Sequence, residues 1–271
     1  MKIKYDKDRI IAVLLVLTIV SVSVIALILY HNLSRKLAYT QTEQASESAF
    51  SSQVSATSLA DPVPEYEEAS GLCANNLDWQ KLEAEYPDII GWIRFDAIDL
   101  SMPLVQAGDN EYYLNHAPDK SDDPYGSIFM DHRNAGDFTD DNTVIYGHST
   151  LDHEMFSDLS LFTDQDFFDR NKQFWIVTPD ANYRCDIVAC IKDAEKTSLA
   201  YERNMDGSLK EKYNAALKHS ALYSDPDWGG EDTKFVTLST CDIETGLDTE
   251  NRIIIRAVIQ KSDTLPDGVN P

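Results

Sequence analysis

The sequence predicts a mainly β domain that closes, or nearly closes, into a barrel with helices at its periphery, preceded by one N-terminal transmembrane helix. Two observations predict the barrel. Short segments rich in β-branched residues recur from residue 89 onward, and turn residues bound each of them. A third observation predicts the anchor, because residues 10–30 carry no charge and consist mostly of Ile, Leu and Val.

The apolar run over residues 10–30 is long enough to cross a bilayer. At about 1.5 Å per residue it spans the roughly 30 Å hydrocarbon core. The alternative is a cleaved signal peptide, but a small-residue cleavage site does not follow the run. Lys and Arg are more frequent before the run than after it, which predicts a cytoplasmic N-terminus and an extracellular domain. Residues 1–36 are therefore predicted to be the cytoplasmic end and single-pass anchor in the cell membrane.

Residues 37–76 are predicted to form a flexible stalk. The stretch from 40 to 70 is rich in Ser, Ala, Glu and Thr and poor in large apolar residues, so it cannot bury enough surface to offset its ordering entropy. The whole chain has 271 residues and a net charge of −23, and the basic residues near the N-terminus make the remainder more acidic still. Such a surface repels phosphate backbones, which excludes nucleic acid as a partner.

The folded domain is predicted over residues 77–261. A helix is expected at 77–86, where Pro87 ends it, and the IIGWIRF run begins the strand-rich region. Two helical insertions are expected at 155–161 and at 208–220, the second with Leu209, Tyr213 and Leu217 on one face. The tail over 262–271 is predicted to be disordered. Further strands are expected at residues 98–106, 127–131, 142–147, 174–178, 184–191, 234–241 and 252–259.

The chain has four cysteines: Cys73, Cys185, Cys190 and Cys241. A disulfide framework is the usual expectation for an exported domain. Cys185 and Cys190 are five residues apart in a predicted strand, so they are expected to point to opposite faces and to bridge poorly. Two buried thiols are the preferred interpretation, and the disulfide state of Cys73, Cys185 and Cys190 stays open.

Cys241 ends a predicted strand, KFVTLSTC, in which alternation places it on the same face as Ser239. A ten-residue loop leads into RIIIRAVI, so the two strands are expected to be antiparallel neighbours with Cys241 and Arg252 close together. An Arg that begins an Ile-rich strand needs a partner. That partner is either a transient anion or a nearby acid such as Asp242 or Glu250.

His148 follows Gly147 at the end of a third predicted strand, TVIYGHST. A His in such a place is most often an ordinary loop residue, but here it accompanies a strand-terminal Cys and Arg. The three side-chain types are chemically complementary: a thiolate attacks a carbonyl, an imidazolium protonates the leaving amine, and a guanidinium stabilises the oxyanion.

Three motifs together resemble the sortases: TLSTC ending at Cys241, YGH ending at His148 and NRIII carrying Arg252. The segments PDIIGWI, PLVQAGDNEYYLNH and GSIFMDHRN, with the helix before the TLSTC strand, are similar to class B members. The resemblance covers nearly the whole predicted ectodomain. It implies an eight-stranded barrel, cleavage of a sorting-signal pentapeptide after its Thr, and transfer of the acyl group from Cys241 to an amine.

The resemblance also implies substrate contacts at Asn110, Leu114, Tyr146 and Ser239. The alternatives are ordinary: a turn Asn, a core Leu, a barrel Tyr and a strand Ser. Asp242 stands where the best-known class B member has Glu, and its shorter reach puts a substrate contact there in doubt. The implied partners are the sorting-signal peptide, an amine from a cell-wall precursor or from a pilin Lys, and the lipid bilayer. The sequence implies neither a cofactor nor a metal.

Two other functions compete with this interpretation. A papain-like cysteine hydrolase also pairs Cys with His, but it places the Cys early on a helix with the His downstream, whereas His148 precedes Cys241. A membrane-tethered binding module would use Cys241 only as a buried thiol. Between the two roles that the resemblance allows, wall anchoring is preferred to pilus assembly because it is the commoner role.

Overall fold

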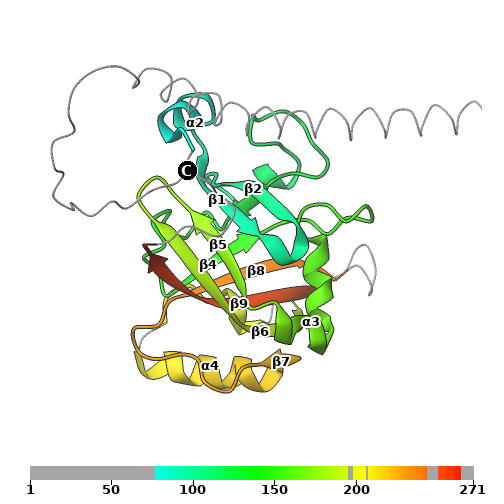
Figure 1. Ribbon diagram of the computed structural model, residues 1–271, viewed down its shortest axis with the longest axis vertical. Helices are drawn as coiled ribbons and strands as arrows, with labels where there is room; N and C mark the ends of the chain where they lie inside the picture. Colours follow the sequence, from blue (N-terminus) through cyan, green and yellow to red (C-terminus); the bar gives the residue numbers. More distant parts are fainter. Residues whose placement is uncertain (1–76, 195–197, 206, 243–249, 264–271) are drawn as a thin grey trace, which may run out of the picture. The chain divides into compact units, whose positions relative to one another are not determined.

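A computed structural model describes residues 77–194, 198–205, 207–242 and 250–263. Their strands form one sheet in the order β5-β1-β2-β3-β4-β8-β9-β6-β7, and β5 also pairs with β6. Eight strands therefore close into a barrel, which β7 extends from β6 (Figure 1). The predicted mainly β barrel with peripheral helices is confirmed. The strands are β1 (Ile89–Phe95), β2 (Leu100–Val105), β3 (Ile128–Met130), β4 (Asn142–Tyr146), β5 (Gln173–Val177), β6 (Asn182–Ala194), β7 (Tyr223–Ser224), β8 (Phe235–Cys241) and β9 (Asn251–Ser262).

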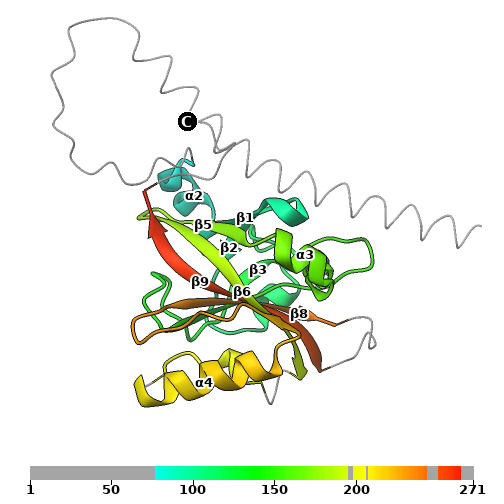
Figure 2. The same cartoon turned by 60° about the horizontal axis from the view of Figure 1, so that its bottom comes forward.

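Helices cover the barrel from outside, with α2 and α4 on opposite sides of it (Figures 1 and 2). The helix expected at 155–161 is instead a 3₁₀ helix, η3, followed by the short α3. Asp164 ends η3 and starts α3. Its backbone amide donates to the Leu161 carbonyl oxygen at 3.0 Å, and its side chain accepts a hydrogen bond from the Phe167 amide at 2.9 Å as the N-cap of α3. The helices are α2 (Trp79–Glu85), η1 (Asp96–Ile98), η2 (Tyr112–Leu114), η3 (Ser157–Thr163), α3 (Gln165–Arg170), η5 (Leu199–Tyr201) and α4 (Gly207–Ser220).

The short helix α2 lies within the predicted range of 77–86, beginning two residues later and ending one residue earlier. Asp78 caps it by accepting a hydrogen bond from the Lys81 amide at 3.1 Å, and the chain leaves the helix at Tyr86, just before Pro87. Leu82 carries its buried face into a cluster with Tyr113 and Phe129. This cluster ties the start of the domain to the loop that follows β2.

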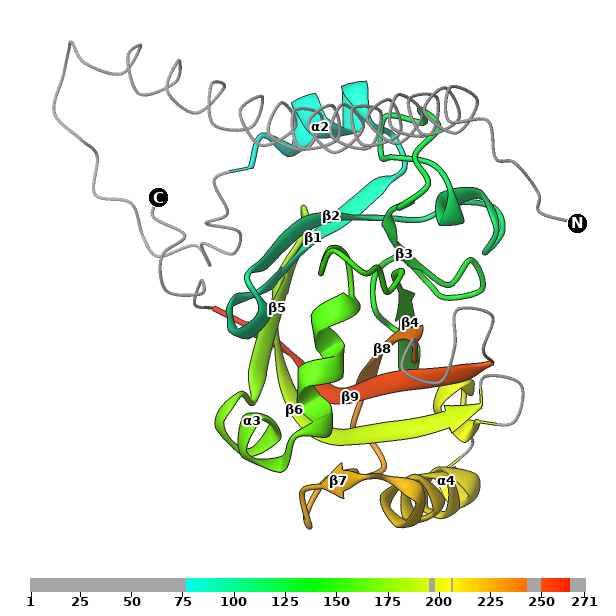
Figure 3. The same cartoon turned by 90° about the vertical axis from the view of Figure 1, so that its right-hand side faces the viewer.

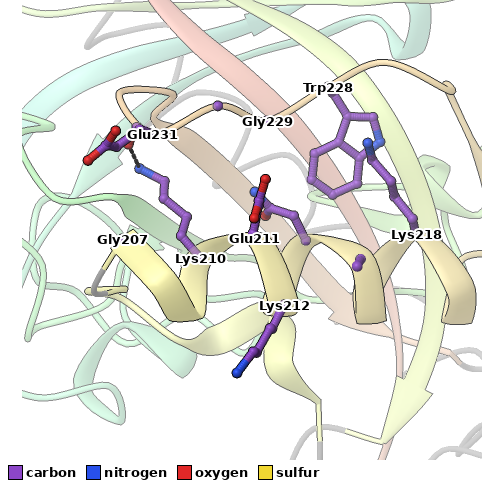
Figure 4. A pocket seen from close by; sticks show the side chains of 11 residues that line it. Gly207, Lys210, Glu211, Lys212, Lys218, Trp228, Gly229 and Glu231 are labelled. Atoms are coloured by element: carbon purple, nitrogen blue, oxygen red, sulfur yellow. Dashed lines mark hydrogen bonds between the residues drawn. The ribbon is translucent and has the colours of Figure 1, made fainter.

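The buried face of α4 differs from the predicted one. Leu217 is buried as expected, but Leu209 is 44% exposed, and among the described side chains of the helix Lys210 and Asn214 are buried as well. Lys210 tolerates burial because its Nζ lies 2.8 Å from an oxygen of Asp141 and 2.8 Å from the carbonyl oxygen of Glu231 (Figure 4). The ion pair between Lys210 and Asp141 therefore helps to determine which face of α4 is buried. The spacing of apolar residues along the helix cannot predict such a contact.

Cys185 and Cys190 lie on the same face of β6, which corrects the prediction of opposite faces. The register of β6 against β9 shifts by one residue between Ile187 and Ala189, so that Cys185 pairs with Ile259 and Cys190 with Ile255. This bulge reverses the alternation between the two cysteines. Both are buried free thiols, as preferred, while Cys73 lies outside the described residues.

The predicted anchor at 10–30 and stalk at 37–76 also lie outside the described residues, as does most of the tail. Among the helices of the described part of the chain, none has the length and hydrophobicity that crossing a bilayer requires. The predicted domain boundaries stay predictions.

Candidate active site

Cys241 is the last residue of β8, and its antiparallel neighbour on β9 is Arg252. Residues that pair directly across two strands point to the same face with side chains about 5 Å apart at Cβ. The register therefore places the thiol and the guanidinium side by side, as the hairpin predicted. Arg252 also pairs with Asp193 on β6, so it lies between a thiol and a carboxylate of its two neighbouring strands.

The strand β4 lies beside β8 (Figure 3) and pairs with it in parallel, and His148 follows β4 by two residues, at the end of the barrel that carries Cys241. Tyr146 pairs with Ser239, and the Gly147 amide donates to the Ser239 carbonyl oxygen at 3.2 Å. His148 follows Tyr146 by two residues and Cys241 follows Ser239 by two residues, so both stand at the same end of this parallel pair. The structure thus brings together the three residues that sequence reasoning selected, and their catalytic roles stay predictions.

The imidazole of His148 has a defined partner. Its Nε2 lies 2.7 Å from the Leu114 carbonyl oxygen, and its own carbonyl oxygen accepts from the Phe156 amide at 2.9 Å. Phe156 packs so closely on Gly147 that a Cβ there would come within 2.8 Å of the ring. His148 is therefore held by its backbone and by one ring nitrogen.

Cys241 differs from the other described cysteines in its access to solvent. It is half-buried, whereas Cys185 and Cys190 are fully buried. Burial raises the pKa of the Cys190 thiol to about 12 and that of the Cys185 thiol well above its usual value. Burial therefore disfavours the thiolate form of Cys185 and Cys190 at neutral pH.

Two arginines of β9 lie on one face but have different environments. Arg252 is partly exposed and its Nη1 donates to the Asn251 carbonyl oxygen at 3.1 Å. Arg256 is fully buried, donates to Thr237 and Asn142, and has its guanidinium 4.0 Å from the centre of the Phe235 ring. Burial lowers the pKa of Arg256 to about 9. Arg252 alone of the pair can reach a ligand.

Asp242, one of the acids proposed as a partner for Arg252, is buried and forms an ion pair with Lys192 at 3.1 Å. A carboxylate in this position is directed toward β6. Its predicted role in substrate contact stays a prediction, and the ion pair already engages one of its two carboxylate oxygens.

The remaining predicted contacts surround the same end of the barrel. The Oδ1 atom of Asn110 accepts from the His132 amide at 2.8 Å, and the side chain of Leu114 is 40% exposed. Ser239 is buried, and its hydroxyl lies 2.8 Å from the Tyr201 hydroxyl. Tyr201 also stacks on Tyr146, with ring centres 6.2 Å apart.

Sequence reasoning missed Tyr201. It comes from η5, which follows β6, and its contacts are with residues of β4 and β8. A single Tyr in a short polar segment has no periodicity that marks it. Its location became clear only from the structure, in which Tyr201 contacts Ser239 and Tyr146.

Asp131 links Asn110 and Tyr146. Burial raises the pKa of its carboxyl, but hydrogen bonds from Arg133 and Asn110 outweigh burial and lower the pKa to about 2. The Arg133 Nη2 lies 2.7 Å and the Tyr146 hydroxyl 3.2 Å from its Oδ2 atom. The network fixes the position of the Tyr146 hydroxyl.

We expect Asp131→Asn to reduce the loss of unfolding free energy that the protein undergoes as the pH falls. Because the folded-state pKa is depressed, the ionised carboxylate contributes stability above about pH 4, and this contribution is lost as the pH falls toward 2. At pH 7 the variant should lose on the order of 2 kcal/mol of unfolding free energy, and near pH 2, where the native carboxyl is about half protonated, most of this difference should be gone. Urea unfolding at both pH values measures this difference in unfolding free energy. Asp180→Asn, at an exposed position, serves as the control. Equal losses at both pH values would contradict the assignment.

The described residues contain no group of three His, Cys, Asp or Glu side chains placed to hold a metal ion. The side chains that the structure places at this end of the barrel are a partly exposed thiol, an imidazole and a guanidinium, with Tyr146 and Tyr201 stacked nearby.

Comparison with known proteins agrees with this geometry. The sortase domain model matches residues 93–260. Sortase B of Listeria monocytogenes is 32% identical over 185 residues, which cover 68% of this chain and 74% of that protein. A Staphylococcus aureus sortase B–substrate complex is similar in fold, with a TM-score of 0.68 and 23% identity over 84% of this chain and 97% of the other. A Streptococcus pyogenes class B sortase involved in pilus biogenesis has a TM-score of 0.61 and 26% identity, and the match covers 68% of this chain and 98% of that one.

Proposed function

Because this chain belongs to the sortase family of cysteine transpeptidases and resembles its class B members, we propose that it cleaves a sorting-signal pentapeptide after its Thr and transfers the acyl group to an amine of the cell wall. The observation that carries the proposal is the strand register. Cys241 pairs with Arg252 on one side, and the neighbouring strand β4 leads to His148 on the other.

In the first half of the reaction the thiolate of Cys241 attacks the carbonyl carbon of the Thr residue. The guanidinium of Arg252 donates hydrogen bonds to the oxygen that becomes negative. The imidazolium of His148 gives a proton to the leaving amine as the peptide bond breaks. The product is a thioester between Cys241 and the Thr acyl group, and the second peptide leaves as a free amine.

In the second half an acceptor amine attacks the thioester. His148, now neutral, takes a proton from the attacking nitrogen, and Cys241 leaves as a thiolate. The enzyme returns to its starting state, and the Thr acyl group ends in a new amide bond. One imidazole thus serves as acid in the first half and as base in the second.

The side chains around Cys241 and His148 are proposed to bind the peptide. Leu114 offers an exposed apolar surface, and Asn110, Tyr146 and Ser239 lie on the adjoining elements. The N-terminal apolar run is proposed to hold this domain at the outer surface of the membrane, where sorting-signal peptides and wall amines are available.

Pilus assembly is the second candidate, and the similarity to the Streptococcus pyogenes class B sortase involved in pilus biogenesis favours it. In that role the acceptor is the side-chain amine of a pilin Lys. The chemistry at Cys241 is the same in both roles. Wall anchoring and pilus assembly therefore differ only in the amine that accepts the acyl group.

The full chain, incubated with a library of Thr-containing pentapeptide substrates and two amines, tests the proposal. The two amines are triglycine and a peptide with one internal Lys, and mass spectrometry detects the products. We expect a Thr-acyl product joined to triglycine. Transfer to the Lys peptide alone would favour pilus assembly, and the absence of any cleavage would favour a binding module.

A further inference from the structure

The hydrogen bond between His148 and Leu114 determines which ring nitrogen carries a proton. The Leu114 group is a backbone carbonyl, which can only accept, so the Nε2 atom at 2.7 Å must donate. In the neutral imidazole the other nitrogen, Nδ1, is then unprotonated. A single carbonyl thereby decides which atom of His148 is available to take a proton from a thiol.

Gly126 packs directly against this carbonyl group. A Cβ at Gly126 would lie 2.7 Å from the Leu114 oxygen, 2.8 Å from the Leu114 carbonyl carbon and 2.3 Å from the Tyr113 oxygen. Its φ of +61° is also in the region that glycine favours. The backbone of residue 126 therefore touches the backbone of 113–114 as only glycine permits.

The segment that carries the carbonyl is anchored in the core. Tyr113 is 1% exposed, its carbonyl oxygen accepts from the Ser127 amide at 2.9 Å, and its hydroxyl donates to Asp88 at 2.8 Å. A displacement of the Leu114 carbonyl would have to move this buried tyrosine as well. The acceptor is therefore fixed in position before any substrate binds.

We propose that Gly126 and the Leu114 carbonyl are the positioning element of His148, in the place that an orienting carboxylate takes in Cys-His-Asp sites. The inference rests on the proposed function of His148. The thiol proton of Cys241 passes to Nδ1, while Nε2 keeps its own proton, which yields a thiolate and an imidazolium. The Nδ1 proton then passes to the leaving nitrogen when the peptide C–N bond breaks. A neutral carbonyl orients the ring without adding a negative charge.

The first test uses the unmodified full chain. Nitrogen-15 NMR of histidine-labelled protein identifies the protonated ring nitrogen, and His148→Gln assigns the signal by its loss. We expect neutral His148 to be the Nε2–H form. A neutral His148 protonated on Nδ1 would overturn the proposal, and this measurement does not depend on any variant that might fail to fold.

The second test compares Gly126→Ala with Gly229→Ala. Gly229 also has a positive φ, +93°, and a Cβ there would lie 2.6 Å from the Asn214 Nδ2 atom, but it belongs to the loop that faces α4 (Figure 4). We expect Gly126→Ala to lower kcat about 10- to 100-fold with little change in KM, since small displacements of catalytic groups cost this much. The histidine spectrum should show loss of the single Nε2–H form. Gly229→Ala should change neither kcat nor the His148 spectrum.

The outcomes separate this inference from the proposed function. A folded Gly126→Ala protein with unchanged kcat and an unchanged His148 spectrum would overturn the positioning role. Normal transfer by Cys241→Ala would instead overturn the proposed function, whatever form His148 takes.

Discussion

Cys241→Ala is expected to abolish transfer of the Thr acyl group, with a loss of at least about 10⁴-fold in kcat, as in other enzymes that lose their nucleophile. Without the sulfur no thioester forms, and no other described side chain on this face is a thiol. The fold should persist, because Cys241 is half-buried at a strand end. The measurement is the rate of appearance of the amide product, followed by mass spectrometry, together with the search for a thioester adduct on the intact protein.

The matched control for this variant is Cys190→Ala, which also removes one thiol. Cys190 is fully buried in β6 and its pKa is raised to about 12, so its loss should affect stability and leave transfer nearly intact. A thiosulfonate probe should label Cys241 in the native protein and spare Cys190. Full activity of Cys241→Ala, or a probe-resistant Cys241, would contradict the nucleophile assignment and favour the binding-module alternative.

Arg252→Lys is expected to lower kcat by about 10²- to 10³-fold, the cost of losing an oxyanion-hole donor. Lysine keeps the positive charge but loses the planar fork of donors, so the variant separates geometry from charge. The KM should change much less, because the interaction strengthens as the oxyanion forms. Steady-state kinetics with a saturating amine measure both parameters.

Arg94→Lys is a suitable control for the Arg252 variant. Arg94 lies in β1 and its Nε is 2.6 Å from an oxygen of Asp96 at the surface, away from β8 and β9. Transfer by this control should stay within about twofold, as surface ion pairs contribute little. If Arg252→Lys kept a third or more of the activity, Arg252 would be better described as a structural residue.

Much of the barrel was predictable from local sequence. The strands around Val144 and Leu238 are short, β-branched and bounded by turn residues, and α2 has a capping Asp before it and a Pro after it. Such signals involve residues only a few positions apart. The strand-terminal positions of Cys241 and Arg252 were predictable in the same way.

Features that depend on distant residues were not predictable. The buried face of α4 follows the ion pair of Lys210 with Asp141, and the bulge in β6 puts Cys185 and Cys190 on one face. Tyr201 reaches Ser239 across 38 positions of the chain. None of these contacts leaves a periodic signal in the segment that makes it.

The sequence by itself determined which residue types stand at the ends of strands: a thiol, an imidazole and a guanidinium, each beside turn residues. The tertiary structure alone decided the exact register of Arg252 with Cys241, the parallel pairing of β4 with β8 that leads to His148, and the Leu114 carbonyl that accepts from its ring. The physical reason is that alternation and turn propensity arise between near neighbours, whereas the register between strands is set by the packing of the whole barrel.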